Sequence, residues 1–557
     1  MDFDKILAKC GDSGRYQYLI LGLLGYIAFT STLHYYSQNI ISFVPEHWCH
    51  HPLLENRSYA QIEAIYKPFG KLASCTRLDA IEGDNVTVSS ERCAKWIYKY
   101  DYGFRSINAE MNWVCDDAYK ARIGQSLFFV GSLLGTLTFG LLGDRLGRVP
   151  TLILANQCGF IGDFCTSYAA NLTQFAVCRF ISGWSADANF YLMFILVLEY
   201  LSPRMRNIHF NITLGVSNCL GSLAASWLAV LAGNWRIYLT FMSLSLLAVA
   251  LFYFVVQESA QWLITRNDAD SAIARLKYIA HFNGRQVPAA DFDAFRSHCA
   301  EKRQHVEQQP TARLLDILRT PRLRRTALIV GFMFMLNVLV FNTITRNVEG
   351  LGLSPFVVFS LFGLVIPIAG VLQAHMQTRL GRKATVILAM LATGLLCCAM
   401  AVALSVEQWQ GQFVLFLALT LPMRLGSSMC YTCASLYSSE LIPTCVRSRG
   451  LAAAHVAGAG ISFLSPYLIH MGVKFAAGPS LILAVVLMVC ALATLRLPET
   501  LNRQLPITLA DGEAFGRGES MLSFECWRRP ADEEETKSTH SIEELELMQS
   551  KTKPLET

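Results

Sequence analysis

The chain has 557 residues, of which 53% are hydrophobic and only 16% are charged, and its formal net charge is +5. A mean hydropathy of +0.35 excludes an ordinary soluble protein, which needs more charged residues to cover its surface. The positive charge follows the pattern of membrane orientation described below, so we expect no nucleic-acid partner.

Twelve apolar runs, each close to the roughly twenty residues that span a bilayer, fall into two sets of six. They cover residues 16–43, 123–142, 150–169, 174–198, 209–232, 236–256, 326–345, 354–374, 384–405, 412–436, 450–470 and 476–496. We expect an all-α polytopic protein with 12 transmembrane helices in contact with a lipid bilayer. The expected parts are a cytoplasmic N-terminus (1–15), two six-helix bundles (16–256 and 326–496), a cytoplasmic central loop (257–325) and a largely disordered cytoplasmic tail (497–557).

Lysine and arginine gather in every second loop, for example at Arg322, Arg324 and Arg325 in the central loop. Basic loops stay in the cytoplasm, so both termini are predicted to be cytoplasmic. No cleavable signal peptide is expected, because the first apolar run is long enough to span. The central loop carries an amphipathic pattern over 270–280, which predicts a short helix under the bundle.

The first outside segment, residues 45–119, is long and polar. Four cysteines in a small exported domain favour two disulfides, and three pairings are possible; these are Cys49, Cys75, Cys93 and Cys115. Asn56 and Asn85 begin N-x-Ser/Thr sequons, which predicts glycosylation. A third sequon at Asn171 lies in a loop too short to be used.

The two halves repeat short motifs at the ends of corresponding runs. GLLGDRLGR (140–148) is echoed by TRLGRK (378–383), and EYLSPRMR (199–206) is echoed by ELIPTCVR (440–447). A duplicated six-helix unit is typical of secondary transporters with a site between the halves.

We expect these cytoplasmic corners to form a latch that breaks when that side opens. Gly147 permits a tight turn, and Asp144 can pair with arginines of the opposing corner. The alternative is that the charges only fix topology. The predicted gating residues are Asp144, Arg145, Gly147, Arg148, Glu199, Arg204, Arg206, Arg379, Arg382, Glu440 and Arg447.

Eight segments occur in an order that resembles solute carrier family 22, the organic cation, anion and carnitine transporters of the major facilitator type. They are GDSGRYQ (11–17), FVPEHWC (43–49), NAEMNWVCDDAYKARIGQSLFFVGSLLG (108–135), GLLGDRLGR (140–148), NWR (234–236), ESAQWLI (258–264), YSSELIPTCVRSRG (437–450) and LPET (497–500) with LP (505–506). The resemblance covers about 500 residues and implies a major facilitator fold and transport of small organic solutes.

The chain departs from the family pattern in several places. Thr378 replaces the acid of the second corner, and the outer segment has four cysteines where some cation carriers have six. In the family, a position seven residues before a proline of the eleventh helix is often acidic in cation carriers and basic in anion carriers. Counting back from Pro466 gives Ala459, so that selector is missing. Asp187 falls where some cation carriers have lysine.

Asp187 is the leading substrate candidate. At 1.5 Å per residue it lies roughly 18 Å from Glu199 at the cytoplasmic end, near the middle of the membrane. A carboxylate there is costly unless it faces a wet cavity or a partner, so we interpret it as a counter-ion for an amine. Phe190 and Tyr191 follow it and would supply a cation–π wall. The alternatives are a structural Asp187 and a substrate role for Asp163.

Other polar and aromatic side chains within the runs complete the predicted binding set. Arg424 and its counterpart Arg179 would hold a substrate carboxylate or snorkel outward. Histidines at 34, 455 and 470 would relay protons or be structural. The remaining candidates are Tyr36, Asn189, Asn218, Phe341, Asn342, Tyr431, Thr432 and Ala459.

The sequence therefore predicts a facilitator for organic cations or zwitterions at the plasma membrane. A carrier of anions or carnitine-like zwitterions is the alternative within transport, and a non-transporting receptor on a carrier scaffold is the alternative from another class. No Gly-x-x-x-x-Gly-Lys-Ser/Thr loop or acid–base constellation occurs, so neither enzyme activity nor a cofactor is expected. The acidic tail is predicted to be disordered or to bind sorting or scaffold proteins.

Overall fold

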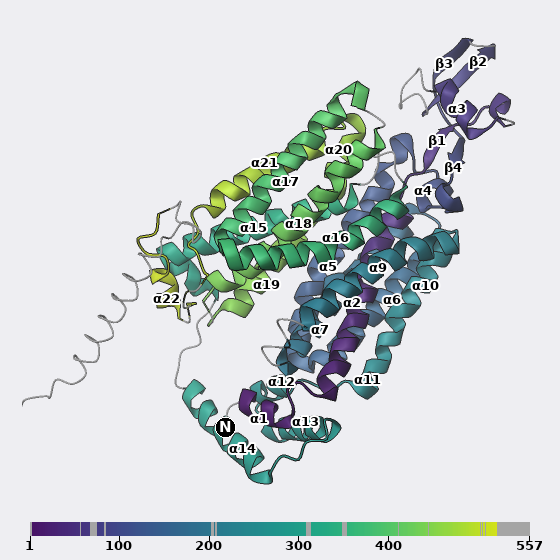
Figure 1. Ribbon diagram of the computed structural model, residues 1–557. Coiled ribbons are helices and arrows are strands. Elements are labelled where there is room, and N and C mark those ends of the chain that lie inside the picture. The colour runs from purple at the N-terminus through teal and green to yellow at the C-terminus, as the bar shows by residue number, and fades with distance from the viewer. Residues whose placement is uncertain are drawn as a thin grey trace, which may run out of the picture.

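The computed structural model shows two helical bundles side by side, with a small domain projecting from one end (Figure 1). It describes residues 3–520 except 56, 67–74, 83–84, 202–204, 206–208, 308–313, 348–353, 410–411, 444, 502, 504 and 507. We call the end that bears the projecting domain the outer end, and the opposite end, where the repeated corners lie, the corner end.

Every predicted apolar run coincides with a helix or with consecutive helices. The first bundle contains α2 (Arg15–Ile41), α5 (Tyr119–Leu146), α6 (Arg148–Ser167), α7 (Leu172–Tyr200), α9 (Asn211–Ala232) and α10 (Trp235–Leu247), continued by a 3₁₀ turn (Ala248–Leu251) and α11 (Phe252–Val255). The second contains α15 (Pro321–Arg346), α16 (Pro355–Leu380), α17 (Arg382–Ser405), α18 (Phe413–Leu441), α19 (Arg447–Ser462) with α20 (Ser465–Lys474), and α21 (Gly478–Thr494).

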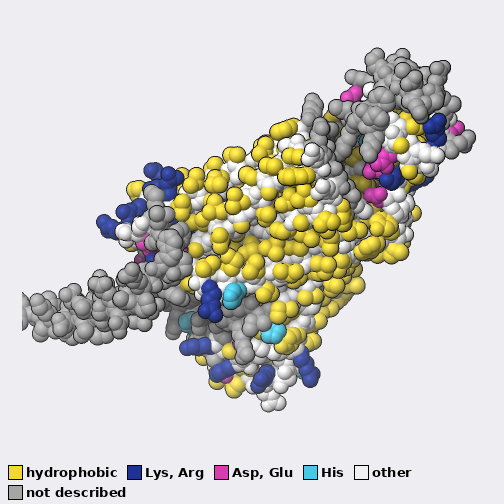
Figure 2. Space-filling view, turned by 45° about the horizontal axis from the view of Figure 1, so that its top comes forward, with side chains coloured by type: hydrophobic (Ala, Val, Ile, Leu, Met, Phe, Trp, Pro, Cys, Tyr) yellow, Lys and Arg dark blue, Asp and Glu magenta, His cyan; other side chains and the backbone are white. Residues whose placement is uncertain are grey.

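Ten helices among the described residues are long and apolar enough to cross a membrane. Of the two remaining spans, α21 is 17 residues long, and α6 carries buried polar residues such as Asp163. Large apolar side chains stay exposed on these helices, with Leu231 81% and Val371 74% accessible. Hydrophobic side chains cover the flank of the bundles, and charged ones gather toward the two ends (Figure 2). A surface of this kind requires lipid around it.

Each bundle folds around its own core, and a third cluster joins them. One core contains residues of α2, α6 and α7, and another contains residues of α15, α17, α18 and α21. The third packs Tyr36 of the first bundle against Phe356, Phe359 and Phe362 of α16. The two halves are therefore packed together at the outer end.

The outer domain consists of two small antiparallel sheets and a short helix, α3 (Tyr59–Tyr66). Strand β1 (Glu46–Cys49) pairs with β4 (Trp96–Lys99), and β2 (Thr76–Glu82) pairs with β3 (Asn85–Arg92). The predicted pair of disulfides is confirmed, and of the three possible pairings the structure has Cys49–Cys93 and Cys75–Cys115. The predicted glycosylation residue Asn56 lies outside the described residues, and Asn85 begins β3.

Short helices cover the corner end. They are α1 (Phe3–Cys10), α12 (Ala260–Thr265), α13 (Ala269–Phe282) and α14 (Ala289–Glu307). The predicted amphipathic helix is confirmed as α13, which buries Ile273, Leu276 and Ile279. Within the predicted tail, α22 (Leu509–Ala514) is formed, and Glu513 accepts hydrogen bonds from the backbone N–H groups of Arg322 and Leu323 at the start of α15. Residues 521–557 lie outside the described residues.

Candidate substrate site and gates

Asp187 lies near the middle of α7 and remains accessible, although its helix is mostly apolar. Its carboxylate accepts a hydrogen bond from the hydroxyl of Ser132 on α5. It also acts electrostatically on Tyr431 of α18 and His455 of α19, both in the second bundle. The carboxylate therefore lies between the two halves, where a positively charged group can reach it.

Arg424 of α18 is the cation of the second half. Its side chain is 1% exposed, and its guanidinium lies over the rings of Phe341 and Phe362, 4.5 and 5.7 Å from their centroids. Nε and Nη1 have no hydrogen-bond partner among the described residues. Buried guanidinium nitrogens normally have such partners, so Arg424 has donors to spare for a carboxylate.

Aromatic rings surround these two charges. Tyr431 packs on Phe341 with centroids 5.0 Å apart and on Phe334 at 6.0 Å, and Phe334 also contacts the ring of His455 at 4.6 Å. Together with Arg424 these side chains form an aromatic wall on the second half, as rings do around bound amines. Ala459 is half-buried on α19, the helix that carries His455.

Several predicted binding residues instead hold helices together. Asn189 is buried inside the first bundle, where Ser31 donates to it and it contacts Asn156. Asn218 accepts a hydrogen bond from Thr32 at 2.8 Å. Thr432 donates to Gln373 of α16. These contacts connect helices within one half.

Other predicted residues lie toward one of the two ends. Tyr191 is half-buried and within electrostatic range of Arg148 and Asp144 at the corner end, and the side chain of Phe190 lies outside the described residues. Tyr36 packs against Phe359 of the opposite half at 5.4 Å, at the outer end.

Three hydrogen bonds that join the halves lie toward the outer end. Tyr35 donates to Asn342 at 2.5 Å, and Asn342 in turn donates to Ser462 of α19. Ser126 donates to the carbonyl of Phe463, and Ser222 donates to that of Phe359. With the aromatic cluster around Tyr36, they hold the two halves together at the outer end.

At the corner end, ion pairs run within each half. Arg148 pairs with Asp144 at 2.7 Å, and Arg382 pairs with Glu440 at 3.3 Å. Glu199 accepts a hydrogen bond from Ser259, and Thr500 makes the equivalent bond to Glu440. The pairing of Asp144 with the opposing corner stays a prediction for another state of the cycle.

The repeat has a structural basis that the motifs alone did not reveal. Gly147 and Gly381 have φ values of +108° and +90°. A carboxylate caps the helix that follows each glycine. Glu258 accepts hydrogen bonds from the backbone N–H groups of Arg148 and Val149 at the start of α6. Glu499 accepts hydrogen bonds from those of Arg382 and Lys383 at the start of α17. Carboxylates at helix N-termini are stabilising, so each corner is stabilised by a carboxylate from a distant part of the chain.

The other predicted gating residues lie at helix ends or outside the described residues. Arg145 is exposed on the last turn of α5, and Arg379 occupies the same place in α16. Arg447 begins α19 and donates to the carbonyl of Ile442. Arg204 and Arg206 lie outside the described residues.

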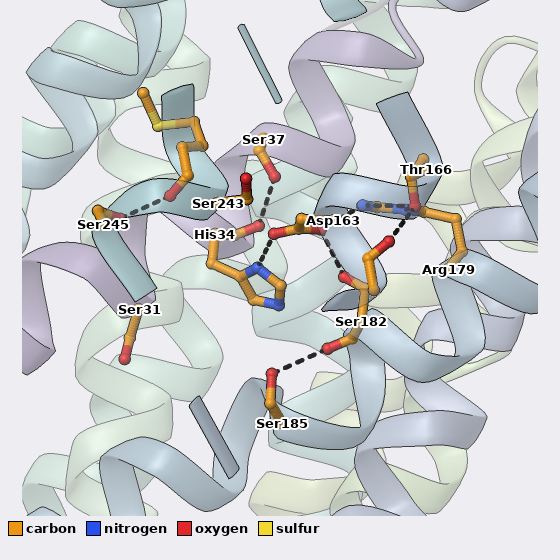
Figure 3. Close-up of polar contacts among 12 residues, drawn as sticks. Ser31, His34, Ser37, Asp163, Thr166, Arg179, Ser182, Ser185, Ser243 and Ser245 are labelled. Carbon is orange, nitrogen blue, oxygen red and sulfur yellow. Dashed lines mark hydrogen bonds and ion pairs between the residues drawn. The ribbon is translucent and has the colours of Figure 1, made fainter. Parts of the chain in front are cut away.

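Asp163, the rival substrate acid, belongs to a buried cluster inside the first bundle (Figure 3). It accepts hydrogen bonds from Arg179 and, at 2.7 Å, from Ser182, and the Nδ1 atom of His34 lies 2.6 Å from it. The side chains of Asp163, His34 and Arg179 are at most 2% exposed. Asp163 and Arg179 therefore neutralise one another, unlike Asp187 and Arg424, which lie in opposite halves.

Sequence reasoning missed one further cation. Arg346 ends α15, where an arginine looks like an ordinary flank of a membrane span. The structure instead buries its guanidinium over Phe129 of the first half, 4.3 Å from the ring centroid.

Comparisons with known proteins agree with this architecture. The family model of the Major Facilitator Superfamily matches residues 118–466. The organic cation transporter protein of Drosophila melanogaster is 27% identical over 93% of this chain and 95% of its own. The β-alanine transporter of the same species is 26% identical over 92% and 89%, and mouse solute carrier family 22 member 6 is 26% identical over 93% and 95%.

Among solved structures, the inward-open conformation of the xylose transporter XylE from E. coli aligns with a TM-score of 0.57. It covers 89% of this chain and 99% of that one at 14% sequence identity. This similarity concerns the fold alone.

Proposed function

This chain belongs to the Major Facilitator Superfamily, and we propose that it carries small organic cations or zwitterions across the plasma membrane by alternating access. Its termini and corners would face the cytoplasm and its disulfide-bonded domain the outside. The tail beyond α22 would bind sorting or scaffold proteins. The described arrangement, packed together at the outer end, would be an inward-open state of the cycle.

The observation that carries the proposal is the accessible carboxylate of Asp187 between the halves. A charged side chain in the middle of a membrane span is expensive unless it faces water or a partner. Among the described residues the hydroxyl of Ser132 is the hydrogen-bond partner of Asp187, and a hydroxyl does not neutralise its charge. An amine or quaternary ammonium would supply the missing positive charge, with the ring of Tyr431 nearby as a cation–π surface.

Arg424 supplies a positive charge that would bind a carboxylate, so the proposed substrates include zwitterions. Its spare donors lie beside Phe341, which packs on Tyr431, and Asp187 acts on Tyr431 from the other half. A solute with an ammonium and a carboxylate would bridge Asp187 and Arg424, and so join the halves. The relatedness to a β-alanine transporter supports this substrate class, while an organic-anion carrier that depends on Arg424 alone is the second candidate.

Uptake into cells tests the proposal with four labelled solutes: tetraethylammonium, β-alanine, carnitine and an aromatic carboxylate. We expect Asp187→Asn to lose the amine, and both Asp187→Asn and Arg424→Gln to lose the zwitterions. Asp270→Asn is the matched control, because Asp270 is an exposed acid paired with Arg296 at the corner end. Entry of the carboxylate alone, or normal amine uptake by Asp187→Asn at equal expression, would refute the cation assignment.

A further inference from the structure

The two disulfides of the projecting outer domain (Figure 1) lie in different surroundings. Cys49 and Cys93 are 3% and 9% exposed, so a reagent in solution reaches their bond poorly. Cys75 and Cys115 are both partly exposed. A ring nitrogen of His47 and the two sulfur atoms of this second pair lie within 4.8 Å of one another. The more accessible disulfide therefore has an imidazole beside it.

A backbone carbonyl determines which nitrogen of His47 carries a proton. Nδ1 lies 3.0 Å from the carbonyl oxygen of Pro45, which only accepts, so Nδ1 carries the hydrogen of that bond. Burial lowers the pKa of His47, so the ring is neutral at neutral pH and Nε2 has an unshared electron pair. Nε2 lies 3.7 Å from the Sγ atom of Cys115. A disulfide sulfur has no proton to donate, so this contact becomes a hydrogen bond only when Cys115 is a thiol.

The backbone of Cys115 has an unfavourable conformation. Its φ is +55°, a left-handed value that is rare for a residue with a Cβ and that is found at functional sites. The disulfide ties this residue, shortly before α5 begins, to Cys75 at the start of the β2–β3 hairpin. Opening of the bond would let the backbone of Cys115 relax. The hairpin would still be held to β1 through Cys49–Cys93.

We propose that the Cys75–Cys115 disulfide is an exchange site for small thiols in the surrounding medium, and that His47 stabilises its opened form. The thiolate of the small thiol attacks Sγ of Cys75, and a new S–S bond forms as the bond to Cys115 breaks. The electron pair goes to Sγ of Cys115, which takes up, through water, the proton that the small thiol released. The incoming sulfur is oxidised and the Cys115 sulfur is reduced, so no other reactant is needed.

The position of His47 determines which sulfur leaves. Cys115 is the sulfur at hydrogen-bond distance from Nε2, so the thiol formed there donates to the imidazole. A cysteine paired with a histidine has a lowered thiol pKa, and a sulfur of lower pKa is the better leaving group. We therefore expect the small thiol to become attached to Cys75 and the free thiol to appear on Cys115.

Purified full-length protein in detergent tests the site, after its free thiols have been blocked with N-ethylmaleimide. It is mixed with 2-mercaptoethanesulfonate and the disulfide of that compound, quenched in acid at increasing times, and analysed by peptide mass spectrometry. We expect the first adduct on Cys75, with a thiol on Cys115, under conditions that leave Cys49–Cys93 closed. Failure of Cys75–Cys115 to open before Cys49–Cys93, or a first adduct mainly on Cys115, would overturn the proposal.

A variant of His47 separates its chemical role from a packing role. His47→Phe keeps a ring against Tyr98, whose centroid lies 6.1 Å from that of the imidazole, but it removes Nε2. Loss of one hydrogen bond should lower the equilibrium constant for opening about 2- to 10-fold, whereas mere loosening of the domain would raise it. His50→Phe is the matched control and should leave the constant unchanged, because His50 pairs instead with Glu55 at 3.0 Å.

An unchanged or larger equilibrium constant in His47→Phe would overturn the proposal. If this variant does not fold, the comparison of the two disulfides in the wild type still decides the question. These measurements use no transported solute. Their failure would therefore leave the proposed function untouched, and failure of the uptake experiment would leave the exchange site untouched.

Discussion

Replacement of Asp163 by asparagine tests whether this acid is structural. The carboxylate holds three donors, from Arg179, Ser182 and His34, in a site that is at most 2% exposed. Asparagine keeps the shape but removes the charge that balances Arg179. Arg179 would remain buried beside Phe128, 6.0 Å from its ring centroid, without an acid.

Breaking a buried ion pair by removing one partner costs about 3–5 kcal/mol. We therefore expect Asp163→Asn to lower the free energy of unfolding by that amount. Removal of both charges, in Asp163→Leu with Arg179→Met, should cost several kcal/mol less than the sum of the single changes, because no buried charge is left. Asp144, which pairs with Arg148, is a control because its side chain is 68% exposed; Asp144→Asn should lower the free energy of unfolding by about 0–1 kcal/mol.

The assay is equilibrium unfolding of the purified protein in mixed micelles with increasing SDS, with uptake measured in parallel. A stability of Asp163→Asn within about 1 kcal/mol of the wild type would refute the reasoning. Additive costs in the double variant would refute it as well. Loss of uptake with unchanged stability would instead make Asp163 a substrate residue.

Three further predictions concern the corners and the outer domain. Gly381→Ala should lower the free energy of unfolding by about 1–3 kcal/mol and reduce surface expression. Gly381 has a φ of +90°, and an added Cβ would lie 2.6 Å from Glu499. Gly140→Ala is the control and should be neutral, because a Cβ added there meets open space. Burial lowers the pKa of His47 in the folded outer domain, so the unfolded state binds more protons and thermal stability should fall as the pH drops below about 6.5; His47→Asn should flatten this dependence. Cys93→Ser should destabilise the outer domain by about 2–5 kcal/mol in a protease-sensitivity assay, whereas Cys165→Ser, at an exposed free thiol, should not.

Much of the fold could be predicted from the sequence, because apolar length and basic loops depend on the bilayer rather than on packing detail. The residues of the substrate site were harder to predict. Asp187 stood out because a lone acid in an apolar run is costly. Asn189 was grouped with it, although two residues on a helix differ by about 200° in direction, and the structure turns Asn189 into the bundle.

Other features depend on contacts between distant segments. The disulfide pairing depends on how β1, the β2–β3 hairpin and the segment before α5 come together, which spacing alone does not provide. Arg346 resembled a flanking residue, and only the approach of Phe129 from the other half revealed its burial. The helix-capping roles of Glu258 and Glu499 likewise depend on loops that fold back onto the corners.

The central claim is that this protein moves a charged organic solute past Asp187. Counterflow with purified protein in liposomes tests it most directly: vesicles preloaded with one unlabelled solute of the uptake panel are diluted into a trace of the same labelled solute. A carrier predicts that label accumulates transiently above its equilibrium level, for an amine or a zwitterion, and that Asp187→Asn abolishes this overshoot. Absence of label entry for every solute, as expected of a receptor, or an overshoot unaffected by Asp187→Asn, would contradict the account.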